Sequence, residues 1–319
     1  ENNKCFLFFH GAIDTSNSEE VATLINEKIN GKLAVVFDFD DVNYISSAGL
    51  RVILKVGKSI KDFEIINAKP SVYEVFDMTG FTQILKISKS LREISIEGKE
   101  LIGEGYMGRV YRLDPETIIK VYYRNSTLDD IKREISLAKT AFVLGVPTAI
   151  PFDVVKIKGG MYGSVFELLN SSCFNKYFIN HPEKTDEYIS LYINLLKTIM
   201  AIEVDDDTNL PHKIDTAKLW LSELTKMKAF DSDVLVKMEK LINTIPEEKH
   251  LIHGDYHIKN IMMQNNEPLL IDMDTLGVGN EIFEFVAFFL TYIGYPSTDS
   301  HNTLDFLGLS QEVCDKIFY

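Results

Sequence analysis

The eight-residue segment HGDYHIKN, residues 253–260, places an acid, an amide and two histidines directly after a short apolar run. An aspartate within hydrogen-bonding reach of a substrate hydroxyl can align that hydroxyl and accept its proton, and Asp255 is the candidate for this role. An asparagine five residues later, Asn260, can bind a metal ion. His253 and His257 are spaced like two zinc ligands, but the glycine between them and the lack of a third ligand disfavour a zinc site.

A second acidic segment, LLIDMD at residues 269–274, follows after a hairpin-like turn at residues 265–268. Asp272 ends an apolar run, where a carboxylate is costly unless a cation neutralises it. Mg²⁺ takes oxygen ligands and keeps several waters, which suits a site that binds a triphosphate. We therefore expect Asn260 and Asp272 to hold Mg²⁺ and to form the catalytic set together with Asp255.

A glycine-rich segment lies about 150 residues earlier, with the sequence GEGYMGRV. Its glycines are Gly103, Gly105 and Gly108, and Val110 ends it. The same string occurs in plain turns and in dinucleotide-binding folds, so alone it is weak evidence. Here a strand-like segment follows it rather than a helix, which favours a glycine-rich flap over the phosphates of ATP.

Lys120 stands in the middle of the apolar segment IIKV. Burying an unpaired ammonium is costly, so a buried lysine needs an acidic partner. Glu134, on the next predicted helix, is the candidate, and such a pair would orient Lys120 toward the α- and β-phosphates. The alternative is a lysine that faces solvent, with Glu134 on an exposed helix face. The local sequence leaves both interpretations open.

The elements around these segments follow two patterns. The first 90 or so residues alternate strand-like and helix-like segments, which is typical of an α/β domain. The expected strands are 6–9, 33–37, 63–66 and 84–87, the expected helices are 18–29, 46–56 and 70–78, and 38–43 is expected to be an acidic loop. We place this domain at residues 1–92.

From about residue 93 the pattern becomes strand-rich and then helix-rich, which predicts a two-lobed α+β domain with a cleft between the lobes. We place the domain at 93–319, with the first lobe at about 93–168 and the second at about 169–319. The expected strands are 94–102, 110–113, 118–123, 154–157 and 163–168, and the expected helices are 128–144, 184–203, 215–228 and 231–244. We expect Trp220 and the aromatic residues of 283–289 to pack in the core.

In residues 93–319 the four motifs occur in an order that resembles the aminoglycoside phosphotransferase and choline kinase group, which shares the bilobal protein-kinase fold. The resemblance implies that Asp255 is the catalytic base, that Asn260 and Asp272 bind Mg²⁺, and that residues 166–169 form the hinge that receives adenine. The ATP-binding residues it implies are Gly103, Gly105, Gly108, Val110, Lys120, Glu134, Glu167 and Leu169. His-Gly-Asp replaces the His-Arg-Asp of protein kinases, and no Asp-Phe-Gly or Ala-Pro-Glu follows, which favours a small-molecule hydroxyl as the acceptor.

The first 92 residues resemble the STAS domain of anti-sigma factor antagonists, on the segments GAID at 11–14, DVNYISSAGLR at 41–51 and VFDMTGF at 75–81. The resemblance implies a domain that binds a partner protein and is switched by serine phosphorylation. The acceptor serine usually stands directly before the glycine, where this chain has Ala48. Ser46 and Ser47 precede it and are the candidate regulatory residues. Their alternative role is to cap the following helix.

The composition is that of an ordinary globular chain, with 45% hydrophobic and 25% charged residues. Its net charge is −14, and residues 1–93 contain 11 basic and 13 acidic side chains, so most of the excess lies in the remainder. An acidic surface repels a phosphate backbone, which disfavours nucleic acid as a partner. It suits a cationic substrate, although solubility alone also explains it.

Three cysteines, Cys5, Cys173 and Cys314, lie far apart in the sequence and favour a reducing compartment. No run approaches the roughly 18 apolar residues of a membrane-spanning helix. The chain shows no signal-peptide pattern, although it begins at Glu1 without a methionine, which leaves a removed leader open. We expect a cytoplasmic protein without a membrane partner.

Together these features predict an ATP- and Mg²⁺-dependent phosphotransferase that acts on a small, cationic hydroxyl compound and is coupled to a STAS module. Two alternatives stay open. In the first, the kinase-like part only senses nucleotide and signals through the STAS part. In the second, it phosphorylates STAS-domain serines of its own or a sister chain.

Overall fold

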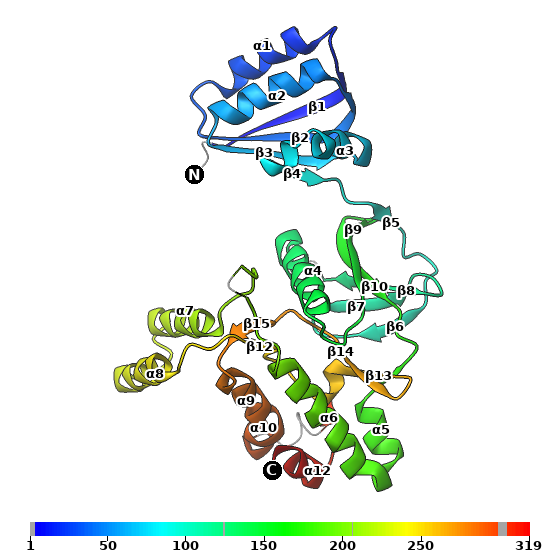
Figure 1. Cartoon of the computed structure of the whole chain (residues 1–319), viewed down its shortest axis with the longest axis vertical. Coiled ribbons are helices and arrows are strands. Elements are labelled where there is room, and N and C mark those ends of the chain that lie inside the picture. Colours follow the sequence, from blue (N-terminus) through cyan, green and yellow to red (C-terminus); the bar gives the residue numbers. More distant parts are fainter. Residues whose placement is uncertain (1–3, 124, 206, 299–304) are drawn as a thin grey trace. The chain divides into compact units, whose positions relative to one another are not determined.

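The change of sequence pattern near residue 93 coincides with a division of the fold into two units, Glu1–Glu93 and Ile94–Tyr319. The structure is a computed structural model that describes residues 4–123, 125–205, 207–298 and 305–319 (Figure 1). Among the described residues, one hydrophobic core cluster lies in the first unit and two lie in the second, and none contains residues of both.

The first unit is a parallel four-stranded sheet in the order β1-β2-β3-β4, with three helices. The strands are β1 (Lys4–Ile13), β2 (Ala34–Ile45), β3 (Asp62–Ala68) and β4 (Lys86–Lys89), and the helices are α1 (Ser18–Ile29), α2 (Ser47–Ser59) and α3 (Pro70–Met78), with a 3-10 turn η1 (Phe81–Gln83). The three helices were predicted to within a few residues. The α/β character expected for this part of the chain is confirmed.

The predicted acidic loop at 38–43 is wrong, because β2 continues through it to Ile45. Phe39 and Val42 within this stretch are fully buried, whereas Asp40 and Asp41 are exposed. The charged residues therefore occupy the solvent side of a strand whose apolar residues enter the core. Charge density suggested a loop, but the apolar residues between the acids decide the structure.

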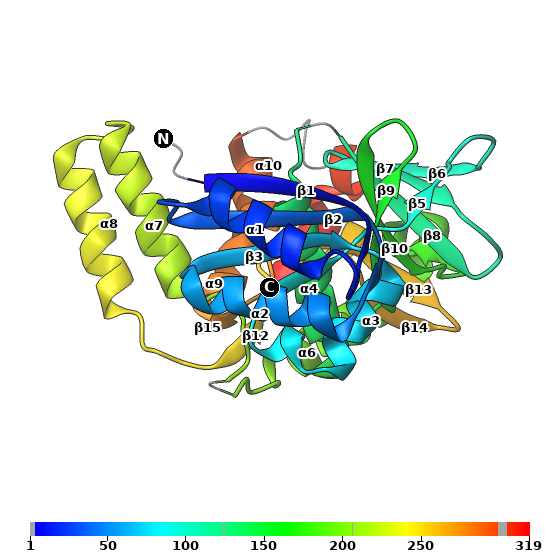
Figure 2. The same cartoon turned by 90° about the horizontal axis from the view of Figure 1, so that it is seen from above.

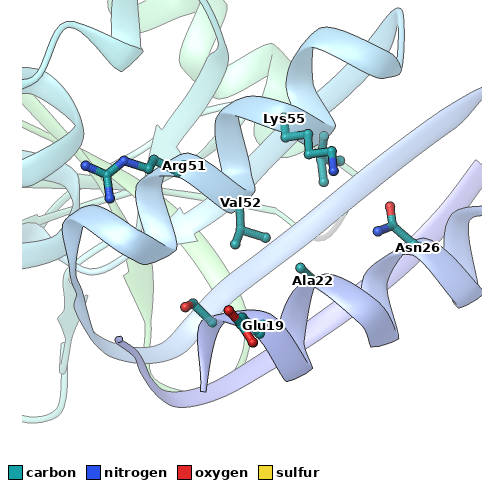
Figure 3. A pocket seen from close by; sticks show the side chains of 8 residues that line it. Glu19, Ala22, Asn26, Arg51, Val52 and Lys55 are labelled. Carbon is teal, nitrogen blue, oxygen red and sulfur yellow. The ribbon is translucent and has the colours of Figure 1, made fainter. Parts of the chain in front are cut away.

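The helices of the first unit pack on one face of the sheet and fill the core between them with aliphatic and aromatic side chains. On the opposite face, Phe6 and Phe8 of β1 are 51% and 67% exposed. A shallow groove runs between α1 and α2, where Ala22 faces Val52 and charged side chains stand at the rim (Figure 3). The groove contains neither a glycine-rich loop nor a pair of acids.

The second unit begins with a six-stranded sheet in the order β5-β9-β10-β8-β7-β6. The strands are β5 (Glu93–Ile94), β6 (Leu101–Glu104), β7 (Gly108–Arg112), β8 (Thr117–Tyr122), β9 (Pro151–Ile157) and β10 (Met161–Glu167), and α4 (Leu128–Val143) follows β8. The single strand predicted at 94–102 is wrong, because a turn splits it into β5 and β6, which lie at opposite edges of the sheet.

The rest of the second unit is mainly helical, with two small sheets beside the helices. The helices are α5 (Asn175–Asn180), α6 (Thr185–Met200), α7 (Lys213–Lys226), α8 (Ser232–Thr244), α9 (Ile282–Phe289), α10 (Tyr295–Thr298) and α12 (Gln311–Phe318), with 3-10 turns η2 (Pro182–Lys184) and η3 (Ile258–Asn260) and a π-helical turn η4 (Leu290–Gly294). The strands are β11 (Ser172–Cys173), β12 (His250–Ile252), β13 (Ile261–Gln264), β14 (Glu267–Leu270) and β15 (Gly277–Gly279). The predicted hairpin turn is confirmed between β13 and β14.

The prediction that Trp220 packs in the core is wrong, and the same prediction for the aromatic residues of 283–289 holds only in part. Helices α7 and α8 lie side by side as a hairpin (Figure 1, Figure 2) and contain no buried residue, and Trp220 on α7 is 68% exposed. On α9, Phe285 and Phe289 are 46% and 45% exposed, whereas Glu284 is fully buried. Phe288 on the same helix is buried in the core, so α9 turns both an acidic and an aromatic side chain inward.

Within the described ranges, no helix has the length and apolar character needed to cross a lipid bilayer.

Candidate active site

The loop after β12 holds Asp255 in a fixed position next to Asn260. The Asn260 side-chain amide donates hydrogen bonds to the backbone oxygen of Asp255 at 3.0 Å and to its Oδ2 at 3.1 Å. The Asp255 side chain is 49% exposed, and His257 Nε2 lies 3.6 Å from its Oδ2. Burial lowers the pKa of His257, which Asp255 only partly opposes. The carboxylate of Asp255 therefore has one oxygen fixed by an amide and remains accessible from solvent.

His253 links this loop to the acidic segment after β14. It is fully buried, and its Nε2 lies 2.8 Å from the backbone oxygen of Asp272. Its Nδ1 accepts the Asp255 N–H at 3.3 Å, and its own backbone oxygen accepts the Thr275 hydroxyl at 2.7 Å. A neutral imidazole that carries its proton on Nε2 satisfies both ring contacts. His253 is thus a fixed spacer between the segments that carry Asp255 and Asp272, and not a metal ligand.

Lys120 pairs with two acids from different elements. Its Nζ lies 2.7 Å from Glu134 Oε1 on α4 and 3.6 Å from Asp272 Oδ1. Burial would lower the pKa of Lys120, but the negative charges of Asp272 and Glu134 outweigh it and raise the pKa above its usual value. Of the two interpretations left open by the sequence, the structure has the buried ion pair, with the lysine and glutamate side chains only 16% and 8% exposed.

Asp272 has a left-handed backbone conformation, with a φ of 65°. This conformation is uncommon for residues other than glycine and costs about 1–3 kcal/mol. The bend turns the chain out of the strand direction after β14, so that the carboxylate of Asp272 faces Lys120 while its carbonyl faces His253.

The glycine-rich segment forms the turn between β6 and β7. The Gly105 N–H donates to the Gly108 carbonyl at 2.9 Å, and Gly103 and Val110 pair across the two strands. A β-carbon on Gly108 would collide with the Val121 carbonyl of β8. Gly108 is therefore required for the close pairing of β7 with β8. This requirement is independent of any ligand that binds beneath the turn.

The predicted hinge lies where β10 ends. Glu167 is the last residue of β10, and its carboxylate accepts the Ile150 N–H at 3.1 Å. Leu169 follows outside the strand, and its carbonyl accepts the Ser171 N–H at 2.9 Å. The structure thus places both residues on the connection between the six-stranded sheet and the helical part of this unit.

The number and charge of the acidic side chains near Lys120 decide whether a divalent cation can bind there. Burial and the neighbouring Asp272 carboxylate raise the pKa of Asp274 to about 6, which indicates more negative charge than the lysine neutralises. In the part of the chain that the structure describes, no three histidine, cysteine or acidic side chains form a cluster that could enclose a metal by themselves. Such a site fits Mg²⁺, which is held by one or two carboxylates together with phosphate oxygens and waters. Asp272 and the amide of Asn260 are suitable oxygen donors.

Two further residues, which the sequence analysis did not select, contact the loop. Both carboxylate oxygens of the buried Glu284 accept backbone N–H groups of His253 and Gly254, at 2.6–3.1 Å. The Nζ of Lys213, the first residue of α7, donates to the Thr275 carbonyl. A lone acid in the apolar stretch Ile282–Tyr295 was a signal for Glu284. No such signal marks Lys213 in the sequence, because only folding brings this residue close to the loop.

The two candidate regulatory serines of the first unit differ in exposure. The Ser46 hydroxyl caps α2 by accepting the Gly49 N–H at 3.4 Å, and its side chain is half-buried. Ser47, the first residue of α2, is exposed. The capping role considered for these serines thus applies to Ser46.

Comparison with known proteins gives matches for both units. A model of the STAS domain matches residues 1–94, and a model of the phosphotransferase enzyme family matches residues 100–303. The putative anti-sigma factor antagonist BtrV of Bordetella bronchiseptica is 36% identical over 85 residues, which cover 25% of this chain and 73% of that protein.

Among solved structures, similar chains include the aminoglycoside phosphotransferase APH(4)-Ia, with 12% identity and a TM-score of 0.47 over 70% of this chain and 93% of that one. ADP-bound APH(2'')-Ib has 17% identity and a TM-score of 0.43 over 77% and 90% of the two chains. The predicted architecture is confirmed: an α/β STAS domain precedes a kinase-like α+β domain. The chain belongs to the phosphotransferase enzyme family and carries a STAS domain at its N-terminal end.

Proposed function

We propose that this protein transfers the γ-phosphoryl group of ATP to a hydroxyl group of a small molecule, with Mg²⁺ as the cofactor. The observation that carries the proposal is that the carboxylates of Glu134 and Asp272 both lie within 4 Å of the Lys120 ammonium group, next to the loop that holds Asp255 and Asn260. These groups come from four separate stretches of the sequence. A merely structural ion pair would not require the exposed Asp255 beside it.

In this proposal Asp255 is the catalytic base. The acceptor oxygen forms a bond to the γ-phosphorus, the bond from that phosphorus to the β,γ-bridging oxygen breaks, and the acceptor proton passes to the carboxylate of Asp255. Asn260 holds one oxygen of that carboxylate, which leaves the other free to align the hydroxyl. ADP is the leaving group.

Lys120 would bind the α- and β-phosphates. Glu134 keeps the ammonium charged and oriented, since the pKa of Lys120 is raised by its acidic neighbours despite burial. The turn containing Gly103, Gly105 and Gly108 would close over the phosphates, and the backbone at Glu167 and Leu169 would receive the adenine. Asp272 and Asn260 would hold Mg²⁺, which neutralises phosphate charge when it is bound.

We infer a cationic acceptor from the charge of the chain, because residues 94–319 contain 22 basic and 34 acidic side chains. The exposed α7–α8 hairpin and its Trp220 would contact the acceptor, because α7 begins at Lys213, whose Nζ donates to the Thr275 carbonyl beside the acidic segment. The STAS domain would bind a partner protein, and Ser47 is the better placed of its two serines for phosphorylation.

The test is to incubate the protein with ATP labelled in its γ-phosphate, with Mg²⁺ or with EDTA, and with a panel of aminoglycosides, choline, ethanolamine and amino sugars. Label on an added compound that requires Mg²⁺ supports the proposal. Label on Ser46 or Ser47 would instead indicate a kinase for STAS serines, and nucleotide binding without any transfer would indicate a nucleotide sensor. A matched reaction with the Asp255→Asn variant identifies contaminating kinases.

A further inference from the structure

We call residues 253–260, which carry the proposed base Asp255, the catalytic loop. Lys213 approaches this loop from a different element, the start of α7. The chain before it is fixed to β15, because the Val278 N–H donates to the Pro211 carbonyl at 2.9 Å and His212 pairs with Val278. Its Nζ donates to the carbonyl of Thr275, three residues after Asp272. The ammonium group is thus held against the acidic segment by a strand whose position is already set.

The Lys213 side chain lies in a trough formed by Gly254, Gly277 and Gly279, which we call the glycine trough. A β-carbon on Gly254 would collide with the lysine Nζ. One on Gly277 would lie 2.9 Å from its Cε, and one on Gly279 would lie 3.1 Å from its Cβ. The trough therefore contacts the lysine along its whole length. Gly254 is also the middle residue of the His-Gly-Asp motif, so this contact reaches the catalytic loop itself.

The charge of Lys213 is not explained by packing. Burial lowers its pKa, while the carboxylates of Glu284, Asp274 and Asp255 oppose that shift. Its only hydrogen bond in the described part of the chain is to a backbone carbonyl. A methionine of similar length would fill the glycine trough without the cost of burying an ammonium. The positive charge is therefore explained by the acidic groups around the lysine and not by the packing of its side chain in the glycine trough.

Four hydrogen bonds connect Lys213 to both acids of the proposed site. Lys213 Nζ donates to the Thr275 carbonyl, the Thr275 hydroxyl donates to the His253 carbonyl at 2.7 Å, and His253 Nε2 contacts the Asp272 carbonyl at 2.8 Å. His253 also accepts the Asp255 N–H. A change at Lys213 would thus alter the spacing between Asp255 and Asp272.

We propose that Lys213 is a positioning residue for the phosphoryl transfer: its ammonium group holds the Thr275 segment against the catalytic loop and so fixes the distance between the base Asp255 and the metal ligand Asp272. This inference rests on the proposed function. It assigns to the start of α7 a role in the chemistry that is separate from any contact of the α7–α8 hairpin with the acceptor.

The test compares Lys213→Met, which keeps the stem and removes the charge, with Lys218→Met on the exposed side of the same helix. Two readouts use Mg-ATP as the probe, namely its affinity by calorimetric titration and its turnover with water as the acceptor. The third is amide hydrogen exchange of residues 253–256 and 273–277 in the nucleotide-free protein, which does not depend on activity.

For Lys213→Met we expect about 100-fold slower turnover, Mg-ATP affinity within about twofold of wild type, and faster exchange in both segments. We expect Lys218→Met to match wild type in all three. Unchanged exchange in Lys213→Met would overturn the positioning role, and so would wild-type turnover. If the wild-type protein fails to bind or turn over Mg-ATP, the proposed function fails, and the exchange measurement still decides whether Lys213 holds the loop.

Chemical rescue separates the charge from the volume. Lys213→Ala removes three carbons and the nitrogen, which propylammonium replaces and 1-propanol replaces without the charge. We expect propylammonium to restore turnover at least tenfold more than 1-propanol does. Equal rescue by both would show that the trough only needs to be filled and would overturn the role of the ammonium group.

Discussion

The charged side chains of the proposed site differ in their access to water in a way that matches their proposed roles. The Lys120 and Glu134 side chains are 16% and 8% exposed, whereas those of Asp272 and Asp255 are 38% and 49% exposed. A buried ion pair is suited to hold a fixed orientation, because rearranging it would leave an uncompensated charge. The more open acids are suited to groups that meet ligands, such as a base and a metal ligand.

Replacing Asp255 with asparagine removes the base but keeps the size of the side chain. We expect turnover to fall by about 10²–10⁴-fold, because general-base catalysis contributes that much, while Mg-ATP affinity changes little. The check is a paired measurement of turnover and calorimetric binding, with Asp233→Asn on exposed α8 as the control. Turnover at the wild-type level in Asp255→Asn would remove this residue from the mechanism.

Asp274 gives a prediction about pH. Burial and the neighbouring Asp272 carboxylate raise its pKa in the folded protein from the usual 3.8 to about 6. The folded state therefore holds a proton that the unfolded state loses, so stability should fall as the pH rises from about 4 to about 6, and then level off. Asp274→Asn removes this loss and should stabilise the metal-free protein by about 3 kcal/mol at pH 7. Unfolding in EDTA at pH 4 and pH 7 measures it, and a variant less stable than wild type at pH 7 would contradict the burial of this charge.

Among the elements, α9 buries an acidic side chain, Glu284, together with one aromatic side chain, Phe288. Two backbone N–H groups of the catalytic loop need an acceptor in the core, and the carboxylate of Glu284 provides it. The helix turns accordingly, which leaves the neighbouring Phe285 and Phe289 nearly half exposed. Satisfying buried polar groups thus outweighs the burial of one more aromatic side chain.

Glu284→Ala should destabilise the second unit by about 3 kcal/mol, because it leaves buried N–H groups of His253 and Gly254 without an acceptor. The expected result is a lower midpoint temperature for the calorimetric transition of that unit, with Glu239→Ala on exposed α8 as the control. Equal transitions for the two variants would mean that water or another group replaces the carboxylate.

The elements also explain what the sequence could and could not predict. Asp255, Asn260 and Asp272 stand in short motifs from which the sequence predicts a site, and in the structure Asn260 contacts Asp255 while Lys120 contacts Glu134 and Asp272. Lys213 is separated from Gly254 by about 40 residues and has no motif around it. Trp220 and Phe285 were misplaced because periodicity identifies an apolar face but not whether a partner element covers it.

At the scale of the whole molecule, the separate cores predict separate unfolding. The first unit packs around residues such as Ile53, which is fully buried on α2, and shares none of its core with the second. We expect two calorimetric transitions. Ile53→Ala should lower the midpoint temperature of only one of them. It should reduce the free energy of unfolding of the first unit by about 2–5 kcal/mol, as is typical of a large-to-small core change.

The complementary variant is Tyr192→Phe, since the Tyr192 hydroxyl is buried in the second unit and donates to the Tyr256 carbonyl. It should lower the midpoint temperature of only the other transition, that of the second unit. A single transition that both variants shift equally would contradict the independence of the two cores.

The short edge strand β5 has a consequence for anyone who divides this chain. Only residues 90–92 separate β4 from β5, yet Ile94 already belongs to the six-stranded sheet, where its carbonyl accepts the Lys158 N–H beside β9. A fragment trimmed to the family match at 100–303 would lose β5 and leave β9 as an unpaired edge, open to intermolecular association. Fragments that start at residue 93 should stay monodisperse in light scattering at concentrations where fragments that start at residue 100 aggregate.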